Sequence, residues 1–148
     1  KKCTTPRSIA LLPNVSARLH SENAKIPVLG SVPAGGPVLS EEYVEDWVSW
    51  DSAWFKHSKD CFMLKVRGDS MIDAGIFEGD YVIASAKIRP KPRDIVIALI
   101  DGGSTVKRYM IKCDKPYLKA ENPSYPNIIP QESMEVQGVV VGLFRKYG

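Results

Sequence analysis

The sequence predicts a mainly β fold, compact and multi-stranded, with little helix. Short apolar segments recur along most of the chain, and turn-forming Gly, Pro, Asn and Asp residues separate them. No stretch of more than about 12 residues carries its apolar residues at the helical period. The length of 148 residues, with 44% apolar and 25% charged residues, is typical of one globular domain. Together these observations favour a single domain built from short strands.

The first third of the chain is the least regular. Residues 1–25 are mixed in character and mostly polar in their second half, which is typical of a linker. Residues 31–37 are dense in Pro, Gly and small side chains, and indicate either a flexible loop or a segment that can lie extended in a narrow groove. Glu41–Val48 is predicted to be a strand. Asp51–Phe55 is predicted to be a short helical turn capped by its first residue.

The rest of the chain alternates between strands and turns. Residues 95–100 form an almost continuous apolar run, so we expect a strand covered on both faces. Asp101–Ser104 is a hairpin signal. We predict strands at residues 61–67, 81–84, 95–100, 105–111, 117–120 and 134–147. The last of these is long and rich in Val, and we expect it to be an edge strand that pairs in a dimer.

Charge and composition exclude several classes of function. The net charge of +3 is too small to indicate nucleic-acid binding by the chain as a whole. No apolar run is long enough to span a bilayer. The three cysteines are widely spaced and odd in number, which favours free thiols in a reducing, cytoplasmic compartment. With two histidines and no C-x-x-C pair, we expect neither a metal site nor a cofactor.

Ser70 is the first candidate for chemistry. It lies in the corner Gly68-Asp69-Ser70-Met71, directly after the strand predicted at residues 61–67. Such a corner can lift a hydroxyl off the end of a rigid strand, as a nucleophile requires. An ordinary turn serine is the alternative, because Ile72 stands where the Gly-x-Ser-x-Gly elbow has its second Gly. A nucleophile at this position needs a base from elsewhere in the chain.

Two kinds of base are available. His20 lies in the expected linker and His57 in a charged loop, so neither favours a Ser-His-Asp triad. Lys107 lies on a predicted strand next to the most apolar strand, and shares a half-apolar face with Tyr109. A lysine base must be neutral, which requires burial to lower its pKa from the free value of about 10.4. An exposed strand lysine is the alternative for Lys107.

Three motifs carry a resemblance to a known family. They are Val32-Pro33-Ala34-Gly35, the run Val66-Arg67-Gly68-Asp69-Ser70-Met71-Ile72-Asp73 with Gly79-Asp80 beyond it, and Thr105-Val106-Lys107-Arg108. In order and spacing they resemble the cleavage site, nucleophile motif and lysine motif of the self-cleaving C-terminal domain of the LexA repressor family. These Ser-Lys peptidases also include UmuD and phage repressors. The resemblance covers residues 26 to 147 and implies the β fold shared by LexA, UmuD and signal peptidases.

The resemblance implies a serine peptidase that acts on its own chain. Ser70 would attack the Ala34–Gly35 peptide bond, with neutral Lys107 as the base and the backbone N–H groups of Asp69 and Ser70 as oxyanion donors. It also implies a homodimeric transcriptional repressor of the DNA-damage (SOS) response. In this family, cleavage is stimulated by RecA–single-stranded-DNA filaments and by alkaline pH. The proline before Ala34 departs from the family pattern and removes one N–H that an extended substrate could pair.

The resemblance also suggests a domain organisation. Residues 1–25 resemble the end of a DNA-binding wing and an interdomain linker, and residues 26–148 resemble the autoprotease and dimerisation domain. We expect the DNA-binding domain to be absent, so that operator DNA would be bound only through that missing N-terminal domain. The alternative is a UmuD-like translesion polymerase accessory protein activated by the same self-cleavage. A signal peptidase and a catalytically silent dimerisation module are further alternatives. For the repressor we expect a bacterial cytoplasmic location and no membrane partner.

Overall fold

The computed structural model describes residues 23–30, 41–54, 58–101, 103–131 and 134–147, and this part of the chain is almost entirely β. The strands are β1 (Asn23–Leu29), β2 (Val44–Asp51), β3 (Cys61–Lys65), β4 (Tyr81–Ser85), β5 (Ile95–Ile100), β6 (Gly103–Lys112), β7 (Lys115–Lys119) and β8 (Met134–Phe144). Helix within these ranges is confined to four short 3-10 turns: η2 (Glu41–Tyr43), η3 (Ser52–Trp54), η4 (Ser58–Asp60) and η5 (Ile72–Ala74). The prediction of a mainly β fold with little helix is confirmed. None of the described helical turns is long and apolar enough to cross a membrane.

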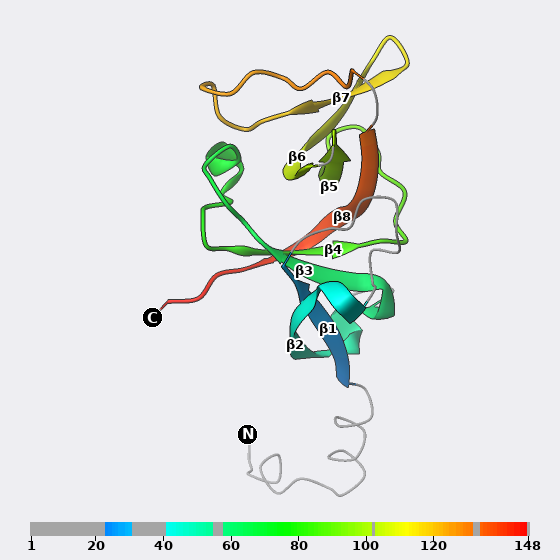
Figure 1. Cartoon of the computed structure of the whole chain (residues 1–148), viewed down its shortest axis with the longest axis vertical. Coiled ribbons are helices and arrows are strands. Elements are labelled where there is room, and N and C mark those ends of the chain that lie inside the picture. The colour runs from blue at the N-terminus through cyan, green and yellow to red at the C-terminus, as the bar shows by residue number, and fades with distance from the viewer. Residues whose placement is uncertain (1–22, 31–40, 55–57, 102, 132–133, 148) are drawn as a thin grey trace, which may run out of the picture.

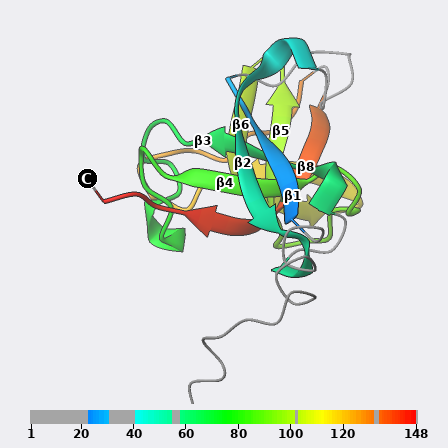
Figure 2. The ribbon, with the colours of Figure 1, turned by 90° about the horizontal axis from the view of Figure 1, so that it is seen from below.

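All eight strands belong to one sheet, in the order β2-β1-β3-β4-β8-β5-β6-β7. Only β1 and β3 are parallel neighbours, and the other pairs are antiparallel. Figure 1 shows β5, β6 and β7 at one end of the molecule, β1 to β4 at the other, and β8 running from one group to the other. Seen from below, β1 and β2 lie side by side and run across the direction of β4 (Figure 2). One strand therefore connects the two parts of the sheet.

β8 reaches both groups because it pairs with different strands along its length. Its residues Met134–Val139 pair with β5, and Val139–Phe144 pair with β4. A register shift interrupts each ladder, and irregularities of this kind bend a strand. The expectation that this strand is a sheet edge is wrong, because β8 lies between β4 and β5. Its second half nevertheless pairs on one side only within the described ranges, so an unpaired edge remains there.

The principal core cluster lies beneath the loop that joins β3 to β4. Phe62 of β3 and Val106 of β6 contribute to it, together with Met71 and Ile76 from the loop itself. Burying a side chain of this size contributes roughly 1.5–3 kcal/mol. The corner that carries Ser70 is therefore held on the sheet by its own apolar neighbours.

β1 is the one described strand that the sequence pattern did not predict. It begins at Asn23, inside the stretch expected to be linker, and its polar start and Pro27 hide the strand pattern. It is a strand because β2 pairs along one of its edges and β3 along the other. Partners this distant in sequence leave no local signal.

The segment around β2 agrees with expectation except at its start. Glu41–Tyr43, expected to open the strand, forms the 3-10 turn η2. The expected turn after the strand is present as η3, and the Asp51 carboxylate accepts the N–H of Ala53 at 2.9 Å, as a capping residue does.

Candidate functional site

The Ser70 corner is tied to the strand ends on either side of it. Past the end of β3, the Val66 N–H donates to the Asp80 carbonyl at 2.7 Å, and the Gly79 N–H donates back to the Val66 carbonyl at 3.0 Å. Gly68 then turns the chain with a positive φ of 78°, which glycine adopts without strain. Ser70 follows, half-buried, at the end of this rigid base. The local fold thus presents one hydroxyl on a fixed support.

Lys107 reaches the same place from β6. The residue is only 7% exposed, and its Nζ lies 2.9 Å from Ser70 Oγ. The Nζ also donates to Thr105 Oγ1 at 2.6 Å and to the Val106 carbonyl at 3.3 Å. Two side chains 37 residues apart in sequence are therefore within hydrogen-bonding distance.

The surroundings of Lys107 favour its neutral form. Burial lowers the pKa of the amine below its ordinary value of 10.5, because desolvation disfavours the ammonium ion. No carboxylate among the described residues forms an ion pair with it. The opposing effect that a nearby negative charge would have is thus missing from this part of the structure.

A cleft of about 330 Å³ opens over the pair. Its lining residues come from the strands and loops on both sides: Gly30, Leu64, Lys65, Val66, Arg67, Ser70, Met71, Ser104, Thr105, Val106 and Lys107. A larger hollow of about 550 Å³ lies towards β1 and β2, and shares Gly30, Lys65 and Arg67 with the cleft. The cleft therefore continues towards the end of β1 rather than closing at Ser70.

Asp69 is held by residues from the loop after β7. Asn122 Nδ2 donates to the Asp69 carbonyl at 2.9 Å, and the Tyr125 hydroxyl donates to the Asp69 carboxylate. That hydrogen bond is the main reason that the pKa of Tyr125 is raised. The sequence alone assigned no role to Asn122 or Tyr125. Nothing local could have assigned these contacts, because they join positions more than fifty residues apart.

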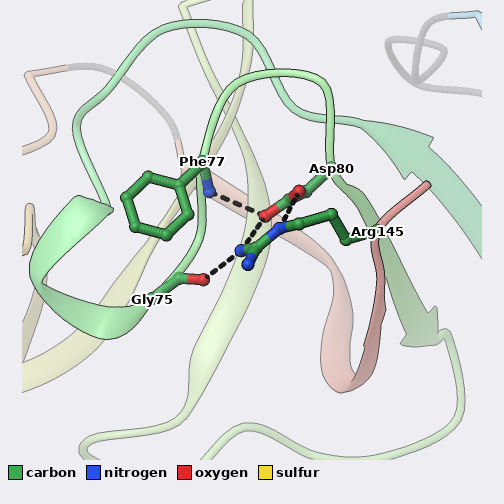
Figure 3. A network of polar contacts seen from close by, with 4 residues as sticks. All are labelled: Gly75, Phe77, Asp80 and Arg145. Carbon is green, nitrogen blue, oxygen red and sulfur yellow. Dashed lines mark hydrogen bonds and ion pairs between the residues drawn. The ribbon is translucent and has the colours of Figure 1, made fainter. Parts of the chain in front are cut away.

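Arg145 forms a second clamp, on the later part of the loop that joins β3 to β4 (Figure 3). Both guanidinium donors of Arg145 reach the Asp80 carboxylate at 2.7 Å, and one of them also reaches the Gly75 carbonyl at 2.9 Å. The Phe77 N–H donates to the same carboxylate at 2.8 Å, and the Arg145 guanidinium stacks over the Phe77 ring. These hydrogen bonds, led by those from Arg145, lower the pKa of Asp80. The clamp fastens the chain beyond β8 to the loop that carries Ser70.

The structure describes some of the site residues predicted from the sequence, and others lie outside its described part. Ser70 and Lys107 meet in the cleft, whereas Asp69, the residue before Ser70, is held by Asn122 and is not among the residues that line the cleft. Ala34 and Gly35 lie outside the described residues, as do both histidines weighed as bases. In the described ranges, His, Cys, Asp and Glu residues form no cluster of three that could hold a metal ion.

Comparisons with known proteins show the family of the chain. The family described as Peptidase S24-like matches residues 27–141. A LexA repressor of Verrucomicrobium spinosum is 44% identical over 131 residues, which cover 87% of this chain and 64% of that protein. A LexA repressor of Clostridium novyi is 39% identical over 145 residues, covering 97% of this chain and 70% of that protein. The chain thus spans only about two thirds of the length of these relatives.

Proposed function

Since this chain belongs to the Peptidase S24-like family, among the LexA repressors, we propose that it cleaves its own Ala34–Gly35 bond with Ser70 as nucleophile and Lys107 as base. The observation that carries the proposal is the 2.9 Å separation of Lys107 Nζ and Ser70 Oγ in a pocket where burial lowers the lysine pKa. A nucleophile and base within this distance have the geometry that proton transfer needs.

The contacts of Lys107 suit a neutral amine. A neutral amine has two N–H bonds and one lone pair. The hydroxyl of Thr105 and the carbonyl of Val106 can accept the two N–H bonds. The lone pair then faces Ser70 Oγ and can accept the hydroxyl proton. These acceptors orient the amine as well as contacting it.

The proposed reaction proceeds in two halves. Lys107 takes the Ser70 proton while Oγ attacks the Ala34 carbonyl carbon, and the resulting ammonium then gives that proton to the Gly35 nitrogen as the C–N bond breaks. Ala34 is left as an ester on Ser70. A water molecule, deprotonated by the neutral Lys107, hydrolyses the ester, and Ser70 recovers its proton. One peptide bond and one water are consumed, and a carboxylate and an amine are formed.

The corner also offers donors for the developing oxyanion. The backbone N–H groups of Asp69 and Ser70 belong to the same corner as the proposed nucleophile, and negative charge would form on the Ala34 oxygen during its attack. Donors fixed in advance at such a point often lower the barrier by a few kcal/mol. We assign this role to both amides.

The position of Gly30 supports an intramolecular reaction. This residue ends the described segment that contains β1, and it lines the cleft together with Ser70 and Lys107. Three residues separate it from Ala34, and an extended chain covers about 3.3–3.6 Å per residue, so the Cα atom of Ala34 can lie at most about 14 Å away. Attachment at this distance supplies the substrate without a binding step.

The biological role proposed here follows the relatives, which are named as repressors. The chain would be the cleavable portion of a repressor of the DNA-damage response in the bacterial cytoplasm. RecA–single-stranded-DNA filaments would stimulate its cleavage, and operator DNA would be bound by a separate N-terminal domain. The second half of β8, which pairs only with β4, would pair through its other edge with the same strand of a second copy in a homodimer.

Mass spectrometry of the purified chain tests the chemistry. After incubation at about pH 10, we expect two fragments that separate between Ala34 and Gly35. Ser70→Ala and Lys107→Met should abolish the cut, whereas Ser49→Ala and Lys119→Met, at exposed strand positions, should leave its rate unchanged. Fragments that persist in Ser70→Ala would sink the proposal.

A further inference from the structure

The segment Glu121–Tyr125 contacts the supports of both Ser70 and Lys107. On the lysine side, the Glu121 carboxylate accepts from Arg108, the residue after Lys107, at 2.8 Å. On the serine side, the Glu121 carbonyl accepts the N–H of Asp73 at 2.9 Å, and Asn122 donates to the Asp69 carbonyl. One short segment thus fixes the position of the Ser70 corner relative to β6.

The contact made by Asn122 acts on a specific peptide group. The carbonyl of Asp69 and the N–H of Ser70 belong to the same planar unit, and in a trans peptide they point in opposite directions. The structure has no cis peptide bonds in its described part. Holding the carbonyl from one side therefore fixes the direction of the Ser70 N–H on the other. A hydrogen bond at the carbonyl also polarises the N–H of that unit.

We propose that Asn122 is a positioning residue for self-cleavage: by holding the Asp69 carbonyl, it directs the Ser70 N–H at the oxygen that becomes negative in the transition state. The inference rests on the proposed function, since it assigns a partner to one of the oxyanion donors. Asn122 acts through the Ser70 amide and contacts no reacting atom.

The environment of Asn122 fits this role. The residue is 9% exposed, and its Oδ1 accepts the N–H of Ser124 at 3.0 Å while its Nδ2 donates to Asp69. Only this orientation of the amide satisfies both contacts, since the Ser124 N–H needs an acceptor and the Asp69 carbonyl needs a donor. The side chain is therefore locked at both ends.

Two substitutions separate this role from simple support of the fold. Asn122→Asp keeps the shape and the acceptor for Ser124, but replaces the donor with an oxygen that repels the Asp69 carbonyl. Asn122→Ala removes both contacts. Asn127→Ala is the matched control, because Asn127 is exposed on the same stretch and forms no hydrogen bond with the corner among the described residues.

The experiment measures the first-order rate of self-cleavage against pH for the full chain and each variant. Loss of a fixed oxyanion donor costs about a hundredfold or more in rate, so we expect a loss of about tenfold to a hundredfold when only its orientation is loosened. The plateau rate at high pH should fall, and the midpoint of the profile, which reports Lys107, should stay where it is in the unsubstituted chain. Asn127→Ala should match the unsubstituted chain in both.

The amide chemical shifts of Ser70, measured by NMR on every variant, give a second readout that does not need cleavage. We expect both Asn122 variants to shift the Ser70 N–H resonance, because the polarising contact is lost. Cleavage at the unsubstituted rate, or a Ser70 resonance that does not move in either variant, would overturn the inference while leaving the dyad intact. If the unsubstituted chain fails to cleave, the dyad proposal fails, and the role of Asn122 in self-cleavage fails with it.

Discussion

Arg145 and Asp80 form a two-pronged ion pair across 65 residues of sequence, and it fastens the chain after β8 to the loop that carries Ser70. Asp80 is 2% exposed, so its charge would be costly to bury without this partner. The same carboxylate accepts the Phe77 N–H, so one side chain organises both the loop and the chain end. The position of the loop that carries Ser70 therefore depends on Arg145, the residue after β8.

Asp80→Asn should lower the melting temperature by several degrees at neutral pH, because the almost completely buried carboxylate and its two charged hydrogen bonds from Arg145 are lost. The folded-state pKa of Asp80 is lowered from 3.8, so the stability from its charge is present above that value and is lost as the pH falls through the folded pKa. The deficit of the variant should thus shrink at about pH 3. Thermal unfolding at the two pH values checks this, with exposed Asp73→Asn as the control. An equal deficit at both pH values would contradict it.

Lys107→Met should be more stable than the unsubstituted chain at neutral pH, because methionine fills a similar volume without a desolvated amine. The folded-state pKa of Lys107 lies below 10.5, so unfolding takes up a proton between the two values and the stability of the unsubstituted chain rises with pH in that window. The advantage of the variant should therefore fade as the pH approaches 10.5. Denaturant titrations in an uncleavable Ser70→Ala background measure it. If the variant is less stable than the unsubstituted chain at neutral pH, the buried amine does not destabilise the folded state.

Gly138→Ala should destabilise the fold by about 1–3 kcal/mol, through overpacking. A Cβ at this position of β8 would lie 3.0 Å from both the Cβ of Ala84 and an edge carbon of Phe62. Gly103→Ala is the matched control, because a Cβ there meets only a carbonyl oxygen at 3.8 Å. If the denaturant midpoint falls equally for both variants, the loss of stability comes from the strand propensity of alanine and not from the close approach of β8 to β3 and β4.

Leu143→Glu should convert a dimer into a monomer at tens of micromolar protein. Leu143 is 42% exposed in the half of β8 that pairs only with β4, so a charge there would face the copy in the proposed dimer. Ile129→Glu, at an apolar side chain that is 70% exposed outside β8, should leave the dimer intact. Light scattering decides between the two states. An unsubstituted chain that is monomeric at this concentration would contradict the proposed dimer.

Local sequence was sufficient for the parts of the fold that have local causes. The apolar runs predicted β3 to β8, and the turn residues predicted the hairpin between β5 and β6. β1 could not be predicted in this way, because it depends on partners at both edges. The place of β8 within the sheet was hidden for a related reason: its two halves pair with different strands, and periodicity does not encode which strands are neighbours.

The candidate site also combines features that local sequence predicts with features that depend on distant contacts. The motifs indicated Ser70 and Lys107, and alternation along the strand put Lys107 on a half-apolar face. Alternation could not say that Lys107 is buried, or that its amine meets Ser70, because both depend on segments that are distant in sequence. The supports from Asn122 and Arg145 were missed because each is a polar contact between distant segments, and such contacts have no period or spacing.

Because Gly30 lines the cleft, the segment that follows it would set the concentration that a competing inhibitor must exceed. In the proposed reaction, the substrate segment follows Gly30 directly and would have an effective concentration in the millimolar range or above. A free peptide of the same sequence would have to exceed that concentration to compete, however well its side chains fit. Compounds that react with Ser70, or that are already rigid in the bound shape, avoid this competition, because they do not rely on matching the local abundance of the tethered segment.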